Sequence, residues 1–371
     1  MSSSPEPLGR AVSPLEGVVV LDLSTSVAGQ YAGRMLAMNG ADVVLVEPPG
    51  GTPTRHRGPR ADGDSFLFRH LNQGKRSIVH DPGSAADRSA LRELAGRADV
   101  ILRDQGTEAL GGAGEQLIDC VVGDAPEGSL YGGWQFSEMI HQALGGAMKT
   151  TGLADRAPLY GIGERASYAA GTTAYISVVS ALYERRRSGT GQRVNATVFE
   201  SLAAMGQNLV SQYSYNGTHG TRRSYPGFLA MLRCADAWIV LFVIRNWPTV
   251  CRVLECEHLL DDARYQTSAD RLRHWEEIVA VLQERAAGRR ADEVVEACQR
   301  GRVSVEKVSG LGDLLESEQW RIRRVMSRVR GPGGEEPAVR SLFTIDGAVT
   351  EVRSPSPRLP AARSENRRRS A

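Results

Sequence analysis

One apolar run near the start of the chain constrains the fold more than any other feature. Residues 17–23 read GVVVLDL, which is typical of a parallel strand buried on both faces. A turn of small residues at 24–29 and a helical stretch at 30–38 follow, and Asn39-Gly40 is a pair that commonly ends a helix. With a second strand expected at 41–46, these segments predict a right-handed β-α-β unit.

The alternation of strands and helices continues beyond this unit. After a loop rich in Gly, Pro and Arg, the expected elements are strands at 77–80, 99–102 and 117–122 and a helix at 85–97. This order favours an α/β fold with an open sheet of Rossmann type. No GxGxxG follows the first strand, so a dinucleotide is not indicated.

The middle of the chain is expected to be mainly helical. We expect helices at 137–148 and 166–187, then a short strand and a helix within 194–205. Gly171, Ala174 and Ser177 leave little bulk on one face of the second helix, which permits a close helix approach.

A smaller α/β unit is expected in the second half, after a polar connection at 218–226. Its expected elements are a strand at 237–243 and helices at 247–254, 269–287, 291–300, 311–315 and 320–324. Segments 327–330, 340–345 and 349–353 are expected to be strands that return to the first domain. The expected domains are a flexible lead (1–13), a large Rossmann-like domain (14–217 and 321–360), a small domain (227–320) and a disordered basic tail (361–371).

Composition excludes several classes of function. Lys and Arg (45) nearly balance Asp and Glu (43), so bulk charge favours neither nucleic acid nor an acidic partner. No apolar run reaches the roughly 18 residues that a membrane span needs, and the N-terminus lacks a secretory signal. The five cysteines form no CxxC or Cys/His cluster. These features predict a reduced cytoplasmic protein without a metal site.

Seven segments in order resemble the class III CoA-transferases, the family of formyl-CoA and carnitine CoA-transferases and the 2-methylacyl-CoA racemases. The segments are PLEGVVVLDLSTSVAGQYAGRMLAMNGADVVLVEPPGG (14–51), LNQGKRSI (71–78), RADVILRD (97–104), QALGGAMKTTG (142–152), ERRRSGTGQRVNATVFESL (184–202), CADAWIVLFVIRNWPTVCRVL (234–254) and PSPRLP (355–360). The resemblance implies a large Rossmann-like domain built from both chain ends, a small central domain, and two chains that interlock as a dimer.

The resemblance also implies a catalytic aspartate at the start of the long helix, where this chain has Ser167. A carboxylate attacks the thioester and forms a mixed anhydride, whereas a serine hydroxyl requires a base. Glu164 lies three residues earlier and is a candidate replacement nucleophile, since i and i+3 share a helix face. The alternative is a solvated glutamate beside Arg165.

Other positions of the implied site are partly kept. Glu138 stands where formyl-CoA transferase has a glutamate and racemase relatives an aspartate, so it is a candidate general base or a residue that orients the substrate. It is equally consistent with a carboxylate that stabilises a helix N-terminus. The preceding histidine of the racemases is replaced by Ser137, and His141 lies one turn further on. Val27 replaces a glutamine of formyl-CoA transferase, and the loop at Ala28 still permits close approach of a ligand.

The CoA-binding end is altered. The family's Glu-Asn-Phe-Arg-Pro-Gly loop is replaced by RDQGTE at 103–108. Lys75, Arg76 and Arg103 remain as candidate partners for the CoA phosphates, although Lys75 and Arg76 are also consistent with residues that simply flank a strand. No permanently bound cofactor is expected, and a CoA thioester is the expected substrate.

Three hypotheses follow. In the first, the protein binds an acyl-CoA but does not use the aspartyl anhydride, with Glu138, Glu164 and Ser167 as its catalytic residues. In the second, it is an inert subunit that pairs with an active paralogue rather than forming a homodimer. In the third, the fold serves a small molecule that is not a CoA ester. No nucleic acid or membrane partner is expected.

Overall fold

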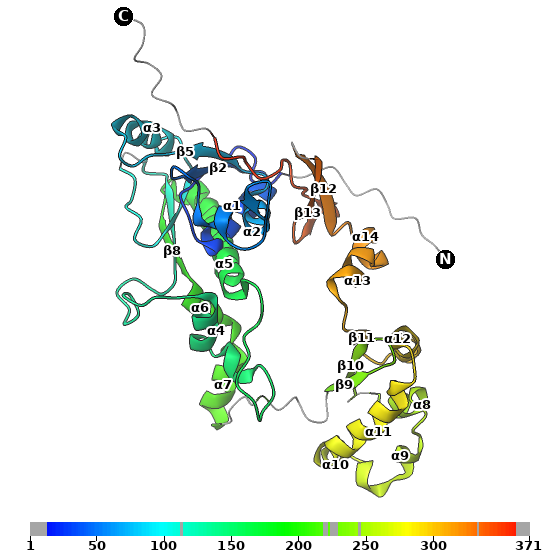
Figure 1. Cartoon of the computed structure of the whole chain (residues 1–371). Helices are drawn as coiled ribbons and strands as arrows, with labels where there is room; N and C mark the ends of the chain where they lie inside the picture. The colour runs from blue at the N-terminus through cyan, green and yellow to red at the C-terminus, as the bar shows by residue number, and fades with distance from the viewer. Residues whose placement is uncertain are drawn as a thin grey trace, which may run out of the picture. The chain divides into compact units, whose positions relative to one another are not determined.

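The structure is a computed structural model that describes residues 13–111, 114–217, 222, 229–243, 246–331 and 334–360. The chain divides into two compact units (Figure 1). The first unit comprises Met1–Gly152, Pro158–Gly220 and Ile322–Ala371, and the second comprises Leu153–Ala157 and Thr221–Arg321. Apart from Ser13 and Arg222, the lead, the tail and the polar connection at 218–226 lie outside the described residues.

The first unit is built on a six-stranded parallel sheet. Its strands are β1 (Val19–Asp22), β2 (Asp42–Glu47), β5 (Arg76–Val79), β6 (Val100–Asp104), β7 (Ile118–Gly123) and β8 (Arg193–Thr197). The order β5-β2-β1-β6-β7-β8 is the doubly wound order of a Rossmann sheet. The first strand pairs on one side with β2 and on the other with β6, so Val20 lies opposite both Val43 and Val100. The predicted Rossmann-type fold is confirmed.

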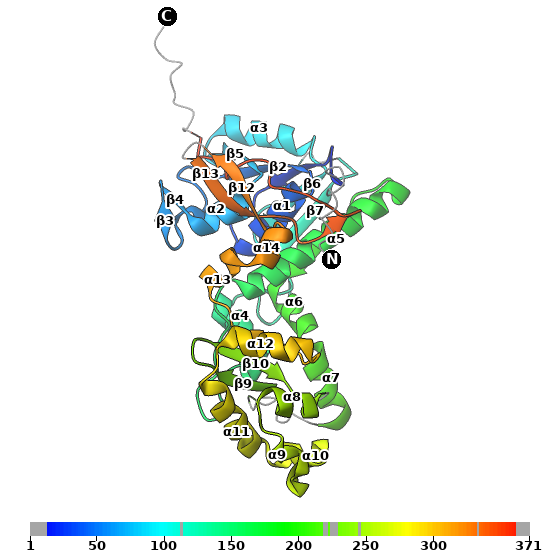
Figure 2. The ribbon, with the colours of Figure 1, turned by 90° about the vertical axis from the view of Figure 1, so that its right-hand side faces the viewer.

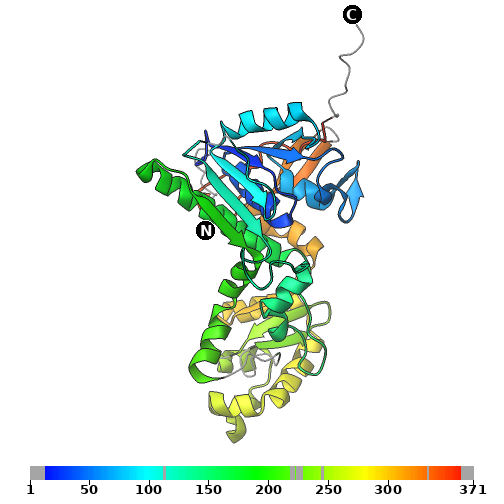
Figure 3. The same cartoon turned by 90° about the vertical axis from the view of Figure 1, so that its left-hand side faces the viewer.

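Helices cover both faces of this sheet. They are α1 (Val27–Met38), α5 (Arg165–Ser188) and α6 (Val198–Met205) on one face and α3 (Ala85–Ala95) on the other. The first unit also contains the helices α2 (Phe66–Asn72), α4 (Glu138–Leu144) and α7 (Gln207–Asn216). Successive strand residues face opposite sides. Val20 of β1 belongs to the core under α1, α5 and α6, whereas its neighbour Leu21 packs with Leu91 of α3. Figures 2 and 3 show α3 on the face of the sheet opposite to α1 and α5.

The close contact between α1 and α5 depends on small residues, as the sequence predicts. A Cβ atom at Gly171 would lie 2.6 Å from the carbonyl oxygen of Ala28 and 3.0 Å from the Tyr31 ring. Ala170 and Ala174 are fully buried in the same contact region. The second turn of α5 is therefore held tightly against the start of α1.

The C-terminal part of the chain returns to the first unit. It forms the hairpin β12 (Met326–Gly331) and β13 (Gly334–Val339) and the short ladder β14 (Thr344–Ile345) and β15 (Ala348–Val349). The buried Arg34 donates a hydrogen bond to the Val339 carbonyl at 2.8 Å, and the buried Arg55 donates to the Pro357 carbonyl at 3.0 Å. These bonds tie both chain ends into one large domain.

The second unit contains a three-stranded antiparallel sheet of order β11-β10-β9. Its strands are β9 (Leu229–Arg233), β10 (Trp238–Phe242) and β11 (Val305–Lys307), and its helices are α8 (Trp247–Val253), α9 (His258–Asp261), α10 (Ser268–Arg273), α11 (Trp275–Ala287), α12 (Ala291–Arg300) and α13 (Leu311–Glu316), with α14 (Glu318–Ile322) at the boundary. The core lies between α8, α11, α12 and one face of the sheet.

Several element boundaries differ from the sequence prediction. Helix α1 begins at Val27 rather than Gln30, because the Ser26 hydroxyl accepts a hydrogen bond from the Gly29 amide and caps the helix there. The single helix expected at 269–287 is divided at His274 into α10 and α11. Of the strand expected at 340–345, only Thr344–Ile345 form a strand, β14. Strands β9, β11 and β13 were not predicted.

Short elements complete the loop after β2. They are the 3-10 turn η1 (Pro53–His56) and the two-residue strands β3 (Arg60–Ala61) and β4 (Asp64–Ser65). Elsewhere in the chain, two further 3-10 turns are η2 (Ala147–Thr150) and η3 (Ala263–Tyr265). The buried ion pair between Arg55 and Glu47, at 2.7 Å, and the Arg55–Asp64 contact hold this loop on the sheet.

Candidate active site

The crevice between β1 and β6 is the point where the strand order of the sheet reverses, and ligands of doubly wound folds bind there. In this chain a carboxylate of the protein fills part of it. Asp104, the last residue of β6, accepts hydrogen bonds from the backbone amides of Thr25 (2.6 Å) and Ser26 (3.0 Å) and from both hydroxyls. Asp104 thus binds at the N-terminus of α1, where the helix dipole favours an anion. Burial raises its pKa, against the lowering effect of these four bonds.

A cavity of about 210 Å³ lies beside this carboxylate, at the carboxyl ends of β6, β7 and β8. Its lining residues come from the sheet, from the first turns of α1 and α6, and from the start of α5: Ser26, Ala28, Asp104, Gln105, Val122, Gly123, Asp124, Ser167 and Val198. Ser167 therefore lies at the cavity that the topology of the sheet marks as a ligand site.

Glu138 and Ser167, two of the predicted catalytic residues, are in direct contact. The Ser167 hydroxyl donates a hydrogen bond to Glu138 Oε2 at 3.1 Å, and the Ser167 amide donates to the same oxygen at 3.2 Å. The Ala166 amide donates to Glu138 Oε1 at 2.7 Å. Glu138 thus caps the N-terminus of the 24-residue helix α5, for which Glu164, the formal N-cap residue, provides no side-chain bond.

Glu138 is fixed from its own helix as well. It is the first residue of α4, which the Ser137 side chain caps. Gln142, one turn later, donates to Glu138 Oε1 at 2.9 Å and to the Gly161 carbonyl at 3.0 Å, and its own amide oxygen accepts from the Gly161 amide at 2.7 Å. Gln142 therefore joins α4 to the segment before α5 and holds the Glu138 carboxylate in place.

Glu164 is directed elsewhere. Its carboxylate forms an ion pair with Arg57 at 2.6 Å, and burial raises its pKa, Arg57 lowers it and Glu138 raises it further. The expectation that Glu164 and Ser167 share a helix face is wrong, because Glu164 precedes the helix and has a non-helical backbone with ψ 49°. Among the described hydrogen bonds, none joins these two side chains.

A second acid at the cavity was not identified from the sequence. Asp124 follows β7 directly, and its Oδ1 lies at hydrogen-bond distance, 2.9 Å, from Nε2 of His141. His141 is buried and stacks on Phe136 with ring centroids 4.9 Å apart, and its Nδ1 has no hydrogen-bond partner in the described part of the chain. Asp124 could have been identified from its position directly after a predicted strand, because residues that follow parallel strands lie at the ligand-binding edge of the sheet.

The expected phosphate partners have contacts within the protein. The Lys75 ammonium is fully buried and contacts Asp22 Oδ2 (2.7 Å), the Gln30 carbonyl (2.7 Å) and Asn72 Oδ1 (2.9 Å), so it forms an internal ion pair. Burial lowers its pKa and Asp22 opposes this.

The two arginines are also engaged. Arg103 makes a bidentate pair with Asp119, with both N–O distances 2.7 Å, and donates to the Thr107 carbonyl, so each of its three nitrogens has a partner within the protein. The hydrogen bonds to Asp119 raise its pKa. Arg76 is exposed and pairs with Asp42 at 2.6 Å, which leaves it accessible to a ligand.

Val27 and Ala28 form the first turn of α1 and are both buried. Ala28 lines the cavity, whereas Val27 is not among its lining residues. The predicted site residues therefore separate into two groups. Ala28 and Ser167 line the cavity, and Glu138 is hydrogen bonded to Ser167. Lys75, Arg103 and Glu164 are held by other contacts.

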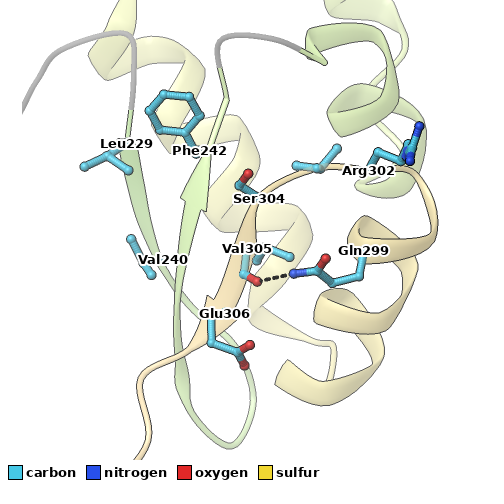
Figure 4. A pocket seen from close by; sticks show the side chains of 9 residues that line it. Leu229, Val240, Phe242, Gln299, Arg302, Ser304, Val305 and Glu306 are labelled. Carbon is cyan, nitrogen blue, oxygen red and sulfur yellow. Dashed lines mark hydrogen bonds between the residues drawn. The ribbon is translucent and has the colours of Figure 1, made fainter. Parts of the chain in front are cut away.

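The second unit has a larger and more open cavity of about 630 Å³ at the outer face of its sheet (Figure 4). Leu229, Val240 and Phe242 give it an apolar floor, and the Gln299 amide donates to the Val305 carbonyl at 2.9 Å. None of the predicted site residues lines it, and Arg302 and Glu306 are its charged members.

Within the described residues, no group of three or more His, Cys, Asp or Glu side chains is arranged to hold a metal ion. None of the described helices is long and apolar enough to cross a membrane. All five cysteines are free and buried.

Comparison with known proteins agrees with this geometry. The family model described as CoA-transferase family III matches residues 15–117 and 128–362. The chain belongs to this family. It is 31% identical to the succinyl-CoA:mesaconate CoA-transferase of Haloarcula hispanica and 26% identical to the succinate–glutarate CoA-transferase of Agrobacterium fabrum, and each match covers 93% of both proteins.

A solved structure also matches almost the whole chain. The crystal structure of a CAIB/BAIF family protein from Brucella suis has a TM-score of 0.86 and 25% identity, and the match covers 94% of this chain and 97% of the other. The resemblance inferred from seven short segments is therefore confirmed over the full length.

Proposed function

We propose that this protein binds an acyl-CoA thioester in the cavity beside Ser167 and does not use an aspartyl anhydride at that position. The observation that carries the proposal is the pair of Ser167 and Glu138 at the start of α5, beside a cavity at the switch point of the sheet. The names of the relatives, which include succinyl-CoA:mesaconate and succinate–glutarate CoA-transferases, support an acyl-CoA as the ligand class.

The contacts of Ser167 limit the chemistry. Within the described structure, Glu138 is the only side chain that is hydrogen bonded to the Ser167 hydroxyl. The Glu138 carboxylate also accepts hydrogen bonds from two backbone amides and from Gln142. Activation of the Ser167 hydroxyl would require this one carboxylate to act as the general base while it also caps the N-terminus of α5. We therefore expect transfer through a Ser167 ester to be slow, and formyl- or carnitine-type transfer to be weak or absent.

A specific observation favours a second candidate, in which the fold serves a small molecule that is not a CoA ester. Lys75 is buried, Arg103 is paired with Asp119, and Asp104 occupies the N-terminus of α1. Three groups suited to CoA phosphates are thus satisfied within the protein. Under this alternative the cavity beside Ser167 keeps its shape but accepts a ligand without a nucleotide.

We also propose that the chain works as a dimer, with a second identical chain or with an active paralogue. Helix α5 presents large apolar side chains to solvent, with Ile176 56% exposed and Tyr183 78% exposed. Exposed apolar side chains of this size along one helix are typical of a surface that a partner covers. A paralogue that carries the aspartate would make this chain the inert member of the pair.

Calorimetric titration with CoA, acetyl-CoA and succinyl-CoA tests the proposal. Saturable binding of the thioesters is the expected result and would exclude the second candidate. Absence of binding by a folded protein would overturn the proposal and favour the ligand without a nucleotide. Substituting Arg76 by Met, which removes the one exposed candidate phosphate partner, should weaken binding of all three ligands alike.

A further inference from the structure

The cavity beside Ser167 is lined by acidic, polar and apolar residues but not by a base. Asp104 and Asp124 are its two charged members, and none of the described residues that line it is a lysine, an arginine or a histidine. Its volume of about 210 Å³ is below the roughly 300–1,000 Å³ of pockets that hold drug-sized ligands, so it fits a short acyl group rather than a whole CoA. The apolar surface, which suits the carbon chain of such a group, comes from Ala28, Val122 and Val198.

Three helices begin at this cavity, and side chains of the protein cap all three. Asp104 accepts hydrogen bonds from the Thr25 and Ser26 amides at the start of α1. Glu138 accepts them from the first two amides of α5, and the Thr197 hydroxyl accepts one at the start of α6. Amides at a helix N-terminus favour an anion. Here these amides are bonded to groups of the protein, which leaves less attraction for an anionic ligand.

The carboxylates at this cavity also lack a cationic partner. Asp104 and Asp124 line it, and Glu138 is bonded to the lining residue Ser167. Among the described ion pairs, none joins one of these three acids to a lysine or an arginine, and the base in contact with them is the His141 ring beside Asp124. A carboxylate of a ligand in the cavity would therefore meet like charge.

Asp124 offers the cavity a hydrogen-bond acceptor that the protein does not use. Its Oδ1 lies 2.9 Å from His141 Nε2, whereas its Oδ2 has no partner among the described hydrogen bonds. The Asp124 side chain is 57% exposed, and that of His141 is 4% exposed. The buried imidazole thus holds one carboxylate oxygen and leaves the other open to a ligand. Hydrogen bonds to an ionised acceptor are roughly twice as strong as neutral ones, so a donor is favoured at this oxygen.

We propose that the acyl group taken by this protein ends in a hydrogen-bond donor, a hydroxyl or an ammonium, and not in a carboxylate. This specificity rests on the proposed binding of an acyl-CoA in the cavity. Asp124 selects the group, because its Oδ2 accepts the donor and its charge, with that of Asp104, repels a carboxylate. The CoA part is common to all such thioesters, so a terminal carboxylate lowers the affinity and does not abolish binding.

Calorimetric titration with four thioesters of three-carbon acyl groups tests this selection. Propionyl-CoA, 3-hydroxypropionyl-CoA, β-alanyl-CoA and malonyl-CoA end in a methyl, a hydroxyl, an ammonium and a carboxylate. For the wild type we expect the hydroxyl or the ammonium thioester to bind more tightly than propionyl-CoA and at least about tenfold more tightly than malonyl-CoA. In D124N the preference over malonyl-CoA should fall at least about threefold. The matched control is E127Q in the same loop, which should keep the preference, since Glu127 is 51% exposed and pairs with Arg193.

The outcomes separate this proposal from the one on which it rests. The proposed function stands and the selection by Asp124 is overturned if malonyl-CoA or propionyl-CoA binds as tightly as both donor-bearing thioesters. A preference that D124N leaves unchanged overturns it as well. Tighter binding of either donor-bearing thioester supports the proposal and identifies the donor. Failure of the folded protein to bind any thioester overturns both proposals.

Discussion

Substitution of Lys75 by methionine tests whether this lysine is an internal ion pair or a ligand of CoA. The side chains of Lys75 and Asp22 are both fully buried and 2.7 Å apart, and the ammonium also contacts Gln30 and Asn72. K75M keeps much of the side-chain volume but leaves the Asp22 carboxylate buried without its cation. Breaking a buried pair from one side typically costs about 3–5 kcal/mol of unfolding free energy.

The control is R76M, one residue further along. Arg76 pairs with Asp42, and their side chains are 65% and 52% exposed, so its loss should cost only about 0–1 kcal/mol. Urea denaturation of both variants, followed by circular dichroism, measures the difference. Equal costs for K75M and R76M would refute the assignment of Lys75 to the interior. A K75M variant with normal stability but weakened CoA binding would restore Lys75 as a phosphate ligand.

Further predictions concern pH and packing. Burial lowers the pKa of His70 from 6.5 to about 4. Between these pH values the unfolded state binds more protons than the folded state, so the unfolding free energy should fall as the pH drops from 6.5 to 4. The expected contribution of His70 to this fall is about 3 kcal/mol. In denaturation curves from pH 7 to pH 4, the unfolding free energy of H70Q should depend less on pH than that of the wild type. An unchanged dependence on pH would contradict the prediction. G171A should destabilise the protein by about 1–3 kcal/mol, because the added carbon would meet the Ala28 carbonyl, whereas G312A, which has open space, should be neutral or slightly stabilising. A thermal melt compares the two, and equal melting temperatures would argue against close contact between α1 and α5.

The sheet was predictable from the sequence because its strands are buried on both faces. Runs such as GVVVLDL require cover on either side, which only a parallel sheet between helices provides. The small residues at Gly171 and Ala174 likewise indicated a close helix approach, and the structure shows that α1 is the partner at Gly171. Strand β9 was missed because apolar residues, Leu229 and Met231, also occupy its open positions, so its sequence does not alternate although its burial does. Strand β11 has only three residues, too few to show a pattern.

The site was predictable in position but not in its contacts. Motif spacing identified Ser167 and Glu138, and the structure shows them hydrogen bonded. The surroundings of Lys75 and Glu164 were not predictable, because their partners Asp22 and Arg57 lie 53 and 107 residues away in sequence. Long-range pairing of this kind leaves no local pattern, so the sequence does not show that Lys75 and Glu164 are paired within the protein.

The central claim is that the scaffold of the family site is intact and that position 167 has lost its acid. The most direct measurement is the release of CoA thiol from succinyl-CoA in the presence of hydroxylamine, compared between S167D and the uncharged control S167N. The account predicts that S167D releases CoA thiol at least about tenfold faster than S167N, a gain of roughly 1.4 kcal/mol in transition-state stabilisation. Equal rates for the two folded variants would contradict it.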